Sequence, residues 1–383
     1  MLVNFGYFLS LGIMNPVLPR FIDGPLGGSK LAVGVGVGSF TIVSLLLRPW
    51  SGRMGDRRGR KSGIVVGAFA HTIGTLGMVV ATSLTHVIAF RMLTGIAEAF
   101  LFVGASTTAQ DLAPDDRRAE AASIFSLSLF SALAIGPAIG ETILDNFGFD
   151  AVWFTAAAVV GLGALVALTL PDTKPDGAPA ENVPLIHRAA LRPGFPLACA
   201  IWSLAAFNSY IPLYALQLGL PGARTVILAN AGTILALRLF AGKVPDRIGA
   251  LRAARMALIF NPAGMAVMGL WAEVPGLFVG AVLLGIGQGF AFPALMSIAV
   301  NNAPANERGS VMGTFTAFFD LSFGGGAIVL GAIAQVAGYK GGFLSAMGVV
   351  LIGTMSLFFA PPRSRVVDRT APPVVPTELP GTP

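Results

Sequence analysis

The chain has 383 residues, of which 54% are hydrophobic and only 11% are charged, and its formal net charge is +6. A soluble domain carries roughly 25% charged residues, so this chain lacks the polar side chains needed to cover a surface that faces water. The composition therefore excludes an ordinary soluble protein and predicts that lipid is the main solvent. The positive charges lie in short segments between apolar runs, which argues against a nucleic-acid-binding face.

Apolar runs recur from the first residue to the end of the chain's last hydrophobic segment. A helix that spans a bilayer needs about 20 mostly apolar residues. Twelve runs meet this requirement, over residues 1–20, 31–50, 62–82, 86–110, 118–144, 151–170, 195–218, 225–241, 251–271, 276–300, 309–335 and 342–360. The sequence therefore predicts an all-α membrane protein with twelve transmembrane helices.

A basic stretch at residues 52–61 connects the second and third predicted helices. It contains Gly52, Asp56, Arg57, Gly59, Arg60 and Lys61. A second copy follows at residues 242–249, where Asp246 and Arg247 lie 190 residues after their counterparts. Other matching residues have the same spacing, namely Gly95 and Gly285, Pro114 and Pro304, and Arg118 and Arg308. This repetition predicts two six-helix pseudo-repeats, which is one of the known transporter plans.

The two predicted halves are residues 1–170 and 194–360. Residues 171–193 are predicted to form a cytoplasmic linker, and the Pro-rich residues 361–383 a disordered cytoplasmic tail. If residues 52–61 face the cytoplasm, 20 of the 25 basic residues, Arg48 among them, lie on that face or at helix ends near it. Because basic loops favour the cytoplasmic side, both termini are predicted to be cytoplasmic.

These motifs resemble the major facilitator superfamily. The family signature Gly-x-x-x-Asp-Arg-x-Gly-Arg-Arg/Lys stands in full within residues 52–61, and Arg91 with Gly95 matches an element of the fourth helix. Gly136, Pro137 and Gly140 resemble a fifth-helix element of the 12-helix drug/proton antiporter branch. That element departs from the family pattern at Ala132 and at Glu141, where the family has glycine. The resemblance implies the major facilitator fold.

The resemblance also implies a role for the basic stretch. In the family, the residue that corresponds to Asp56 locks the two halves together on the cytoplasmic side while the carrier is open to the outside. A simpler interpretation is that the basic residues only fix the topology. Asp111, at the cytoplasmic end of the fourth predicted helix, is a candidate partner for the basic stretch.

A charge inside a membrane helix costs a few kcal/mol or more and is a candidate functional group, and four charged residues of the predicted helices stand out. They are Arg91, Glu98, Glu141 and Asp320. A carboxylate in an apolar cavity can carry a proton in competition with a cationic or polar substrate. The alternative is a structural pair, such as Arg91 with Glu98 or Glu141.

Polar residues lie in the first, fourth, seventh and tenth predicted helices, which line the central cavity in the family. The candidates of this kind include Asn4, Tyr7 and Asn15 in the first helix, Asn208, Tyr210 and Tyr214 in the seventh, and Gln288 in the tenth. A hydrogen bond between helices is the commoner role for such a residue.

These features predict a secondary active transporter that exports a small molecule, a drug or a metabolite, in exchange for protons by alternating access. An uptake symporter for a polar solute such as a sugar is the alternative within transport. A non-transporting membrane receptor or scaffold is the alternative of another class. We expect no enzymatic activity, cofactor or resident metal. The expected partners are a small-molecule substrate, protons and the lipid bilayer of a bacterial plasma membrane, but not nucleic acid, and the chain is expected to be a monomer.

Overall fold

The computed structural model describes residues 1–113, 118–173, 186–241, 247–302 and 308–359. The predicted tail at residues 361–383 and most of the predicted linker lie outside these ranges. The described part of the chain is helical and contains no strand. The predicted all-α fold is therefore confirmed.

The helices follow one another with short connections. In the first half they are α1 (Leu2–Met14), α2 (Val17–Asp23), α3 (Lys30–Gly38), α4 (Phe40–Arg58), α5 (Lys61–Gly77), the short helix Met78–Val80, α6 (Leu84–Ala97), the π-helix Glu98–Phe102, α7 (Val103–Asp111) and α8 (Arg118–Leu168). In the second half they are α9 (Arg188–Gln217), α10 (Arg224–Ala241), α12 (Ala250–Leu270), α13 (Val274–Asn301) and α14 (Arg308–Phe359).

Ten helical segments of the described residues are long and apolar enough to cross a membrane. Two of them, within α8 and α14, reverse direction at Gly148 and Gly338, whose φ angles are 80° and 71°. Glycine adopts this left-handed region without the steric cost that a Cβ brings. Counting each side of the two bends separately gives twelve segments, which is consistent with the predicted number.

Positive-φ glycines show the repeat in the backbone itself. Among the described residues there are six of them, and they form three pairs with nearly constant spacing. Gly59 and Gly249 are 190 residues apart, as are Gly148 and Gly338, and Gly27 and Gly219 are 192 apart. The two halves therefore turn at equivalent points.

Two helix boundaries differ from the sequence expectation by more than the others do. Residues 52–58, expected in a loop, form the last turns of α4, and only Gly59 (φ 88°) and Arg60 separate α4 from α5. Helix α9 begins at Arg188, seven residues before the predicted start at residue 195. The side chain of His187 accepts a hydrogen bond from the backbone N–H of Ala189, which satisfies a free donor of the first turn and allows the earlier start.

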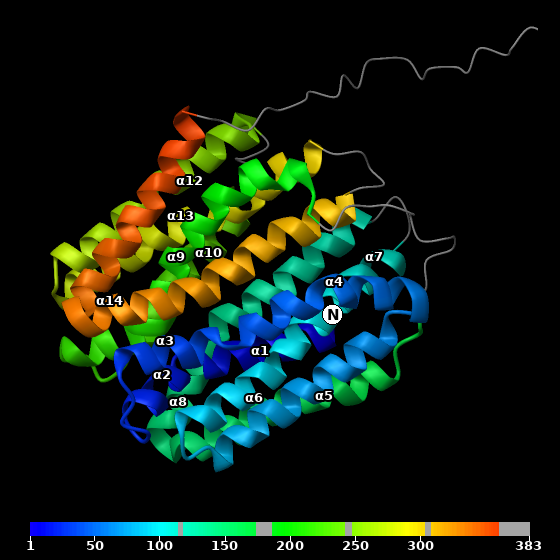
Figure 1. Ribbon diagram of the computed structural model, residues 1–383, viewed down its shortest axis with the longest axis horizontal. Coiled ribbons are helices and arrows are strands. Elements are labelled where there is room, and N and C mark those ends of the chain that lie inside the picture. Colours follow the sequence, from blue (N-terminus) through cyan, green and yellow to red (C-terminus); the bar gives the residue numbers. More distant parts are fainter. Residues whose placement is uncertain (114–117, 174–185, 242–246, 303–307, 360–383) are drawn as a thin grey trace, which may run out of the picture.

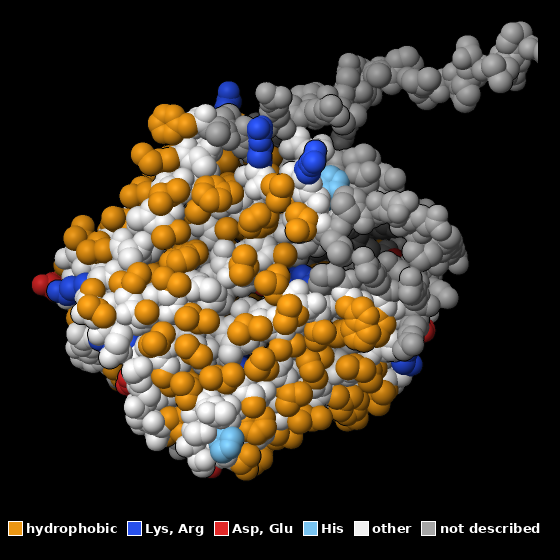
Figure 2. All heavy atoms as spheres, viewed as in Figure 1, with side chains coloured by type: hydrophobic (Ala, Val, Ile, Leu, Met, Phe, Trp, Pro, Cys, Tyr) orange, Lys and Arg blue, Asp and Glu red, His pale blue; other side chains and the backbone are white. Residues whose placement is uncertain are grey.

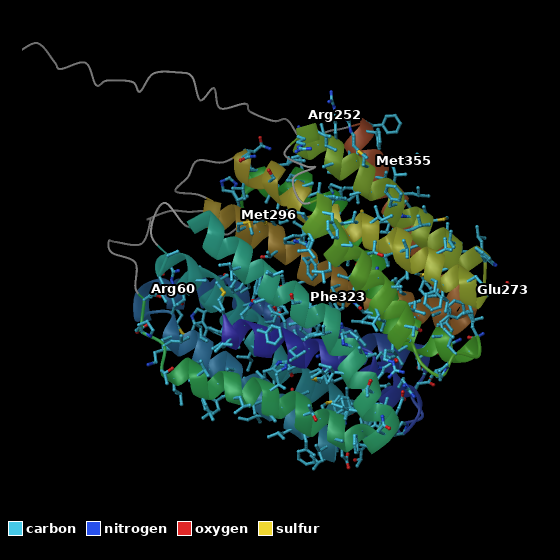
Figure 3. All side chains as sticks on the ribbon, turned by 180° about the vertical axis from the view of Figure 1, so that it is seen from behind. Arg60, Arg252, Glu273, Met296, Phe323 and Met355 are labelled. Atoms are coloured by element: carbon cyan, nitrogen blue, oxygen red, sulfur yellow. The ribbon has the colours of Figure 1, made fainter. Side chains whose placement is uncertain are left out.

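The two halves lie side by side, with α1–α8 forming one bundle and α9–α14 the other (Figure 1). We call the end with the α4–α5 turn the basic end and the other end, with the α9–α10 turn, the opposite end. In Figure 3, Arg60 marks the basic end, Glu273 the opposite end, and Phe323 lies between them. Hydrophobic side chains cover most of the face in Figure 2, whereas most charged side chains lie near its rim, as expected for a surface in lipid.

The main contacts between the halves are those of α3 and α4 with the first part of α14, and of α10 with α8. One close approach is between Gly38 and Gly324, where a Cβ on either glycine would contact the other's backbone. Small residues at such a crossing let two membrane helices pack backbone to backbone. This packing brings charged groups of the two halves together at mid-height.

Candidate functional site

Arg48 lies on α4 in the interior of the protein, although the sequence had placed it among the basic residues near the cytoplasmic face. Its side chain is 7% exposed and lies on the side of α4 that contacts both α14 and the π-helix Glu98–Phe102. A buried guanidinium needs partners, because its desolvation is costly. Those partners come from both halves of the chain.

Two carboxylates share the guanidinium of Arg48. The Nη2 atom lies 2.6 Å from Oδ2 of Asp320, on α14, and 3.6 Å from Oε1 of Glu98. Arg48 and Glu98 belong to the first half and Asp320 to the second, so the shorter ion pair crosses the interface between the halves. The sequence named both carboxylates as candidates but missed the cation between them.

Two hydroxyl groups complete this site, which we call the Arg48 cluster (Arg48, Glu98, Asp320, Tyr7 and Ser44). Tyr7, on α1, donates a hydrogen bond to Oε2 of Glu98, and Ser44 donates to Oδ2 of Asp320 at 3.2 Å. With both carboxylates ionised, the cluster carries one positive and two negative charges. A single added proton would balance it, and buried charge without compensation is unfavourable.

The π-helix explains how Glu98 reaches the cluster. The segment Glu98–Phe102 interrupts the helix between α6 and α7 directly at this residue. Such π-bulges shift the direction of the following side chains and are frequent at functional sites. Nothing in the sequence alone signals this irregularity.

Arg91 pairs with neither of its predicted partners. It is buried, donates from Nη2 to the backbone carbonyl of Val37 at 3.0 Å, and lies over the ring of Phe40 at 4.5 Å from the ring centroid. The structural pairs suggested as an alternative, Arg91 with Glu98 or with Glu141, are absent among the described residues, because both carboxylates have other partners. Arg91 holds α6 against α3 and α4.

Glu141 lies on α8, away from the Arg48 cluster and toward the opposite end of the protein. Its carboxylate accepts hydrogen bonds from the backbone N–H groups of Ala223, at 2.9 Å, and of Arg224, at 2.5 Å. Arg224 is the first residue of α10 and Ala223 precedes it, so a side chain of one half caps a helix of the other half.

Two of the other cavity candidates are only partly buried. Asn208 lies on α9 and Gln288 on α13, and both side chains are of intermediate exposure. The Nε2 atom of Gln288 is buried without a hydrogen-bond partner among the described residues. A free donor of this kind is available to a bound molecule.

At the basic end, the described contacts hold the α4–α5 turn in place. Arg60 forms an ion pair with Asp111 at 2.7 Å, as the sequence suggested, and the backbone N–H of Lys61 donates to Asp172 at 3.2 Å. Gly59 forms the turn itself. Asp172 lies at the start of the predicted linker and the other residues lie in the first half, so the contacts position the turn without linking the halves.

Several residues of the predicted gate cannot be placed by their side chains. Gly52, Asp56 and Arg57 lie in the last turns of α4, and their side chains are outside the described part of the structure. Asp246 lies outside the described residues altogether, and Arg247 is exposed at the start of the following segment.

The glycine–proline element of α8 packs within the first half. A Cβ on Gly136 would contact the backbone of Gly12 at 2.7 Å, and one on Gly140 would overlap the backbone of Ile13. Pro137 lies in the same contact with α1. The element therefore lets α8 approach α1 closely and leaves the next residue, Glu141, to face the second half.

The two-bundle helical fold and the charged cluster between the bundles define a membrane transport protein, and comparison with known sequences gives the family. The profile of the Major Facilitator Superfamily matches residues 1–274 and 231–380. The chain belongs to this superfamily, whose members are transport proteins rather than enzymes.

Two bacterial relatives match over almost their whole length. An uncharacterized MFS-type transporter of Salmonella typhimurium is 27% identical over 357 residues, covering 90% of this chain and 91% of the relative. The uncharacterized MFS-type transporter YhhS of Escherichia coli is 27% identical over 365 residues, covering 92% of this chain and 89% of the relative. Both relatives support a multi-pass membrane transporter.

Solved structures show the same fold at lower sequence identity. A POT family transporter in complex with a thioalcohol-conjugated peptide has a TM-score of 0.78 at 15% identity, covering 93% of this chain and 94% of that one. The human organic anion transporter MFSD10 has a TM-score of 0.72 at 16% identity, covering 93% and 97%. A bacterial homolog of the human lysosomal transporter Spinster, in an inward-facing conformation, has a TM-score of 0.75 at 15% identity. That match covers 93% of this chain and 94% of the homolog.

Proposed function

We propose that the protein is a secondary active transporter that exports a small molecule, a drug or a metabolite, in exchange for protons by alternating access. The observation that carries this proposal is the Arg48 cluster, in which carboxylates of the two halves share one buried cation. The cluster has one negative charge in excess, so either a proton or a cationic group of a substrate would balance it. Two ligands that compete for one site are the basis of exchange.

The cluster also couples ligand binding to the position of the halves. Protonation of Asp320 removes its negative charge and weakens the 2.6 Å ion pair that joins α14 to α4. A ligand shifts a conformational equilibrium only by its difference in affinity for the two states. A proton that prefers the state with a broken pair would therefore favour the alternative arrangement of the halves.

The proposed orientation places the basic end and both termini on the cytoplasmic side of a bacterial plasma membrane. The described contacts between the halves extend from the Arg48 cluster to the opposite end, which corresponds to a carrier that is closed toward the outside. We assign the gate on the cytoplasmic side to the basic stretch, with Asp56 and Arg57 as its central residues and Asp246 and Arg247 as their counterparts. Asn208, Gln288 and Arg91 are proposed to contact or orient substrate.

The experiment that tests this function uses proteoliposomes that contain the purified protein and the pH dye pyranine. A panel of lipophilic cations, starting with ethidium, and of organic anions and zwitterions is added under an imposed pH gradient. Proton movement opposite to substrate movement supports exchange. Proton movement in the same direction would support the uptake symporter instead.

Three variants test whether the Arg48 cluster is needed for the exchange. Glu98→Gln and Asp320→Asn remove the carboxylates of the Arg48 cluster, and Asp150→Asn removes an exposed carboxylate of α8 as a matched control. We expect the first two variants to lose substrate-linked proton movement and the control to keep it. Absence of any flux across the panel in the unaltered protein would favour the receptor or scaffold.

A further inference from the structure

Two helix caps join the halves at the opposite end, and both have the same design. In one, the backbone N–H of Arg224, the first residue of α10, donates to the side chain of Glu141 on α8. In the other, the backbone N–H of Lys30, the first residue of α3, donates to Oε1 of Gln335 on α14 at 3.0 Å. In each case a side chain of one half caps a helix of the other half.

The two caps are equivalent by the internal repeat. The donors Lys30 and Arg224 are 194 residues apart, and the acceptors Glu141 and Gln335 are also 194 apart. Both donor residues are basic, and the side chain of each also reaches the other half. Lys30 places Nζ 4.5 Å from the ring centroid of Tyr339, and Arg224 donates to Thr142 at 2.9 Å.

The acceptors differ in chemistry and in environment. Glu141 has a titratable carboxylate, is 1% exposed and binds two N–H donors, whereas Gln335 has a neutral amide and is exposed. A carboxylate gains from the partial positive charge of a helix N-terminus, and an amide or a protonated carboxyl group gains much less. Protonation of Glu141 would therefore make its carboxyl group neutral, like the amide of Gln335, and would weaken the stronger cap.

Other charges surround Glu141 without pairing with it. Arg20 of α2 lies 3.5 Å from Asp145 of α8, and both act on Glu141 through space. On α10 the only charged neighbour is Arg224, whose guanidinium is bound to Thr142. Among the described residues these are the charged groups that face the carboxylate. None of them forms a salt bridge with it, so the backbone donors are its direct partners.

We infer that Glu141 is a second proton-binding site, separate from the Arg48 cluster, which latches the opposite end of the two halves when ionised and releases it when protonated. The inference rests on the proposed function for its direction, because a proton that enters from outside would open that side. Gln335 forms the matching latch that does not respond to pH. The pair therefore provides one proton-sensitive and one constant contact.

The test measures the distance between the halves at the opposite end with two spin labels. Cysteines replace Thr85 and Glu273, which are exposed at this end on different halves, in a Cys199→Ala background. Double electron–electron resonance in lipid nanodiscs at alkaline pH gives the ratio of open to closed molecules. We expect Glu141→Gln to raise this ratio about threefold to tenfold, as the loss of a charge at a helix terminus would.

Gln335→Glu is the complementary variant. Position 335 is exposed, so the substitution should not disturb the fold. It is expected to lower the open-to-closed ratio at alkaline pH and to add a response to acidification. Thr142→Val keeps the carboxylate and removes the Arg224 side-chain bond together with the bond from Thr142 to the carbonyl of Ala138 within α8, so it should change the ratio little. An unchanged ratio and pH response in both Glu141→Gln and Gln335→Glu would overturn the inference.

The measurement needs neither a substrate nor a proton gradient. If the labels report the expected shifts while proteoliposomes show no substrate-linked proton movement, the latch stands and the proposed exchange fails. If exchange occurs and the labels show no shift in either variant, the latch fails and the proposed function stands.

Discussion

The Arg48 cluster and the Glu141 junction both join the two halves through a carboxylate, but the carboxylate meets different partners in each. Asp320 meets the full charge of Arg48, together with the competing carboxylate Glu98. Glu141 meets only neutral backbone N–H groups. The first contact depends on a balance of whole charges, and the second on the orientation of a helix end. Substitutions should therefore have larger effects in the cluster than at the junction.

Removal of the cation should have the largest effect. Arg48→Met leaves Glu98 and Asp320 buried together with no positive charge between them. Breaking a buried ion pair by removing one partner typically costs about 3–5 kcal/mol. We expect a loss of stability of this size, seen as a lower midpoint of thermal unfolding in detergent, and complete loss of transport.

The matched control for this variant removes all three charges. Arg48→Met combined with Glu98→Gln and Asp320→Asn leaves a neutral site of similar volume, and neutral replacements of buried ion groups are often tolerated. We expect the triple variant to regain most of the lost stability but no transport. A triple variant as unstable as Arg48→Met would show that packing, not charge, makes Arg48 necessary.

The next prediction concerns Asp320→Asn, which should affect proton coupling much more than it affects the stability of the fold. Asp320→Asn leaves Arg48 paired with Glu98, so the cluster becomes neutral instead of carrying one excess negative charge. We expect a stability change within about 1–2 kcal/mol, since a hydrogen-bonded group replaces a charged one. Substrate-linked proton movement in proteoliposomes should nevertheless be lost. A variant that still moves protons with substrate would remove Asp320 from the coupling mechanism and leave Glu98 as the proton site.

The fold could be predicted from the sequence because its signals are local. Apolar runs of about 20 residues define spanning helices, and the repeat at a spacing of 190 residues defines two halves. The same spacing separates Gly148 from Gly338, where the backbone turns, and Arg48 from Arg238. That last pair was the available signal for an arginine inside a helix, but the rule for basic loops assigned both residues to the cytoplasmic face.

The site could be predicted only in part because it depends on contacts between halves. The sequence identified Glu98, Glu141 and Asp320 by the cost of charge in a membrane. It could not show which of them meet, since that depends on the register of α4 against α14 and on a π-helix at Glu98. The partner of Glu141 likewise lies 82 residues away, at the end of a helix in the other half.

A smaller effect is expected where the two halves pack without charges. A Cβ on Gly324 would overlap the hydroxyl of Thr41, whereas a Cβ on the neighbouring Gly325 would contact nothing within 4 Å. Gly324→Ala should therefore cost about 1–3 kcal/mol of the closed arrangement, the usual range for an overpacked site. The spin-label distance at the opposite end would show a larger open fraction.

Gly325→Ala is the control for this substitution, because it changes the same helix by the same methyl group. It should leave the distance distribution as it is in the unaltered protein. Equal effects of the two alanines would mean that helix propensity in α14, rather than contact with α4, controls the closed arrangement.

The smallest effect is expected at the basic end, where Arg60 and Asp111 form an ion pair within the first half. The side chain of Asp111 is 33% exposed, and partly exposed pairs contribute about 0–1 kcal/mol. Asp111→Asn should therefore leave the unfolding midpoint almost unchanged and reduce the transport rate only modestly, because the pair positions the α4–α5 turn but does not bridge the halves. Asp150→Asn, an exposed carboxylate on α8, supplies the baseline for a change without a structural partner. If Asp111→Asn abolished transport as Asp320→Asn is expected to do, the turn would have to act across the interface, and the contrast between bonds within a half and bonds between halves would fail.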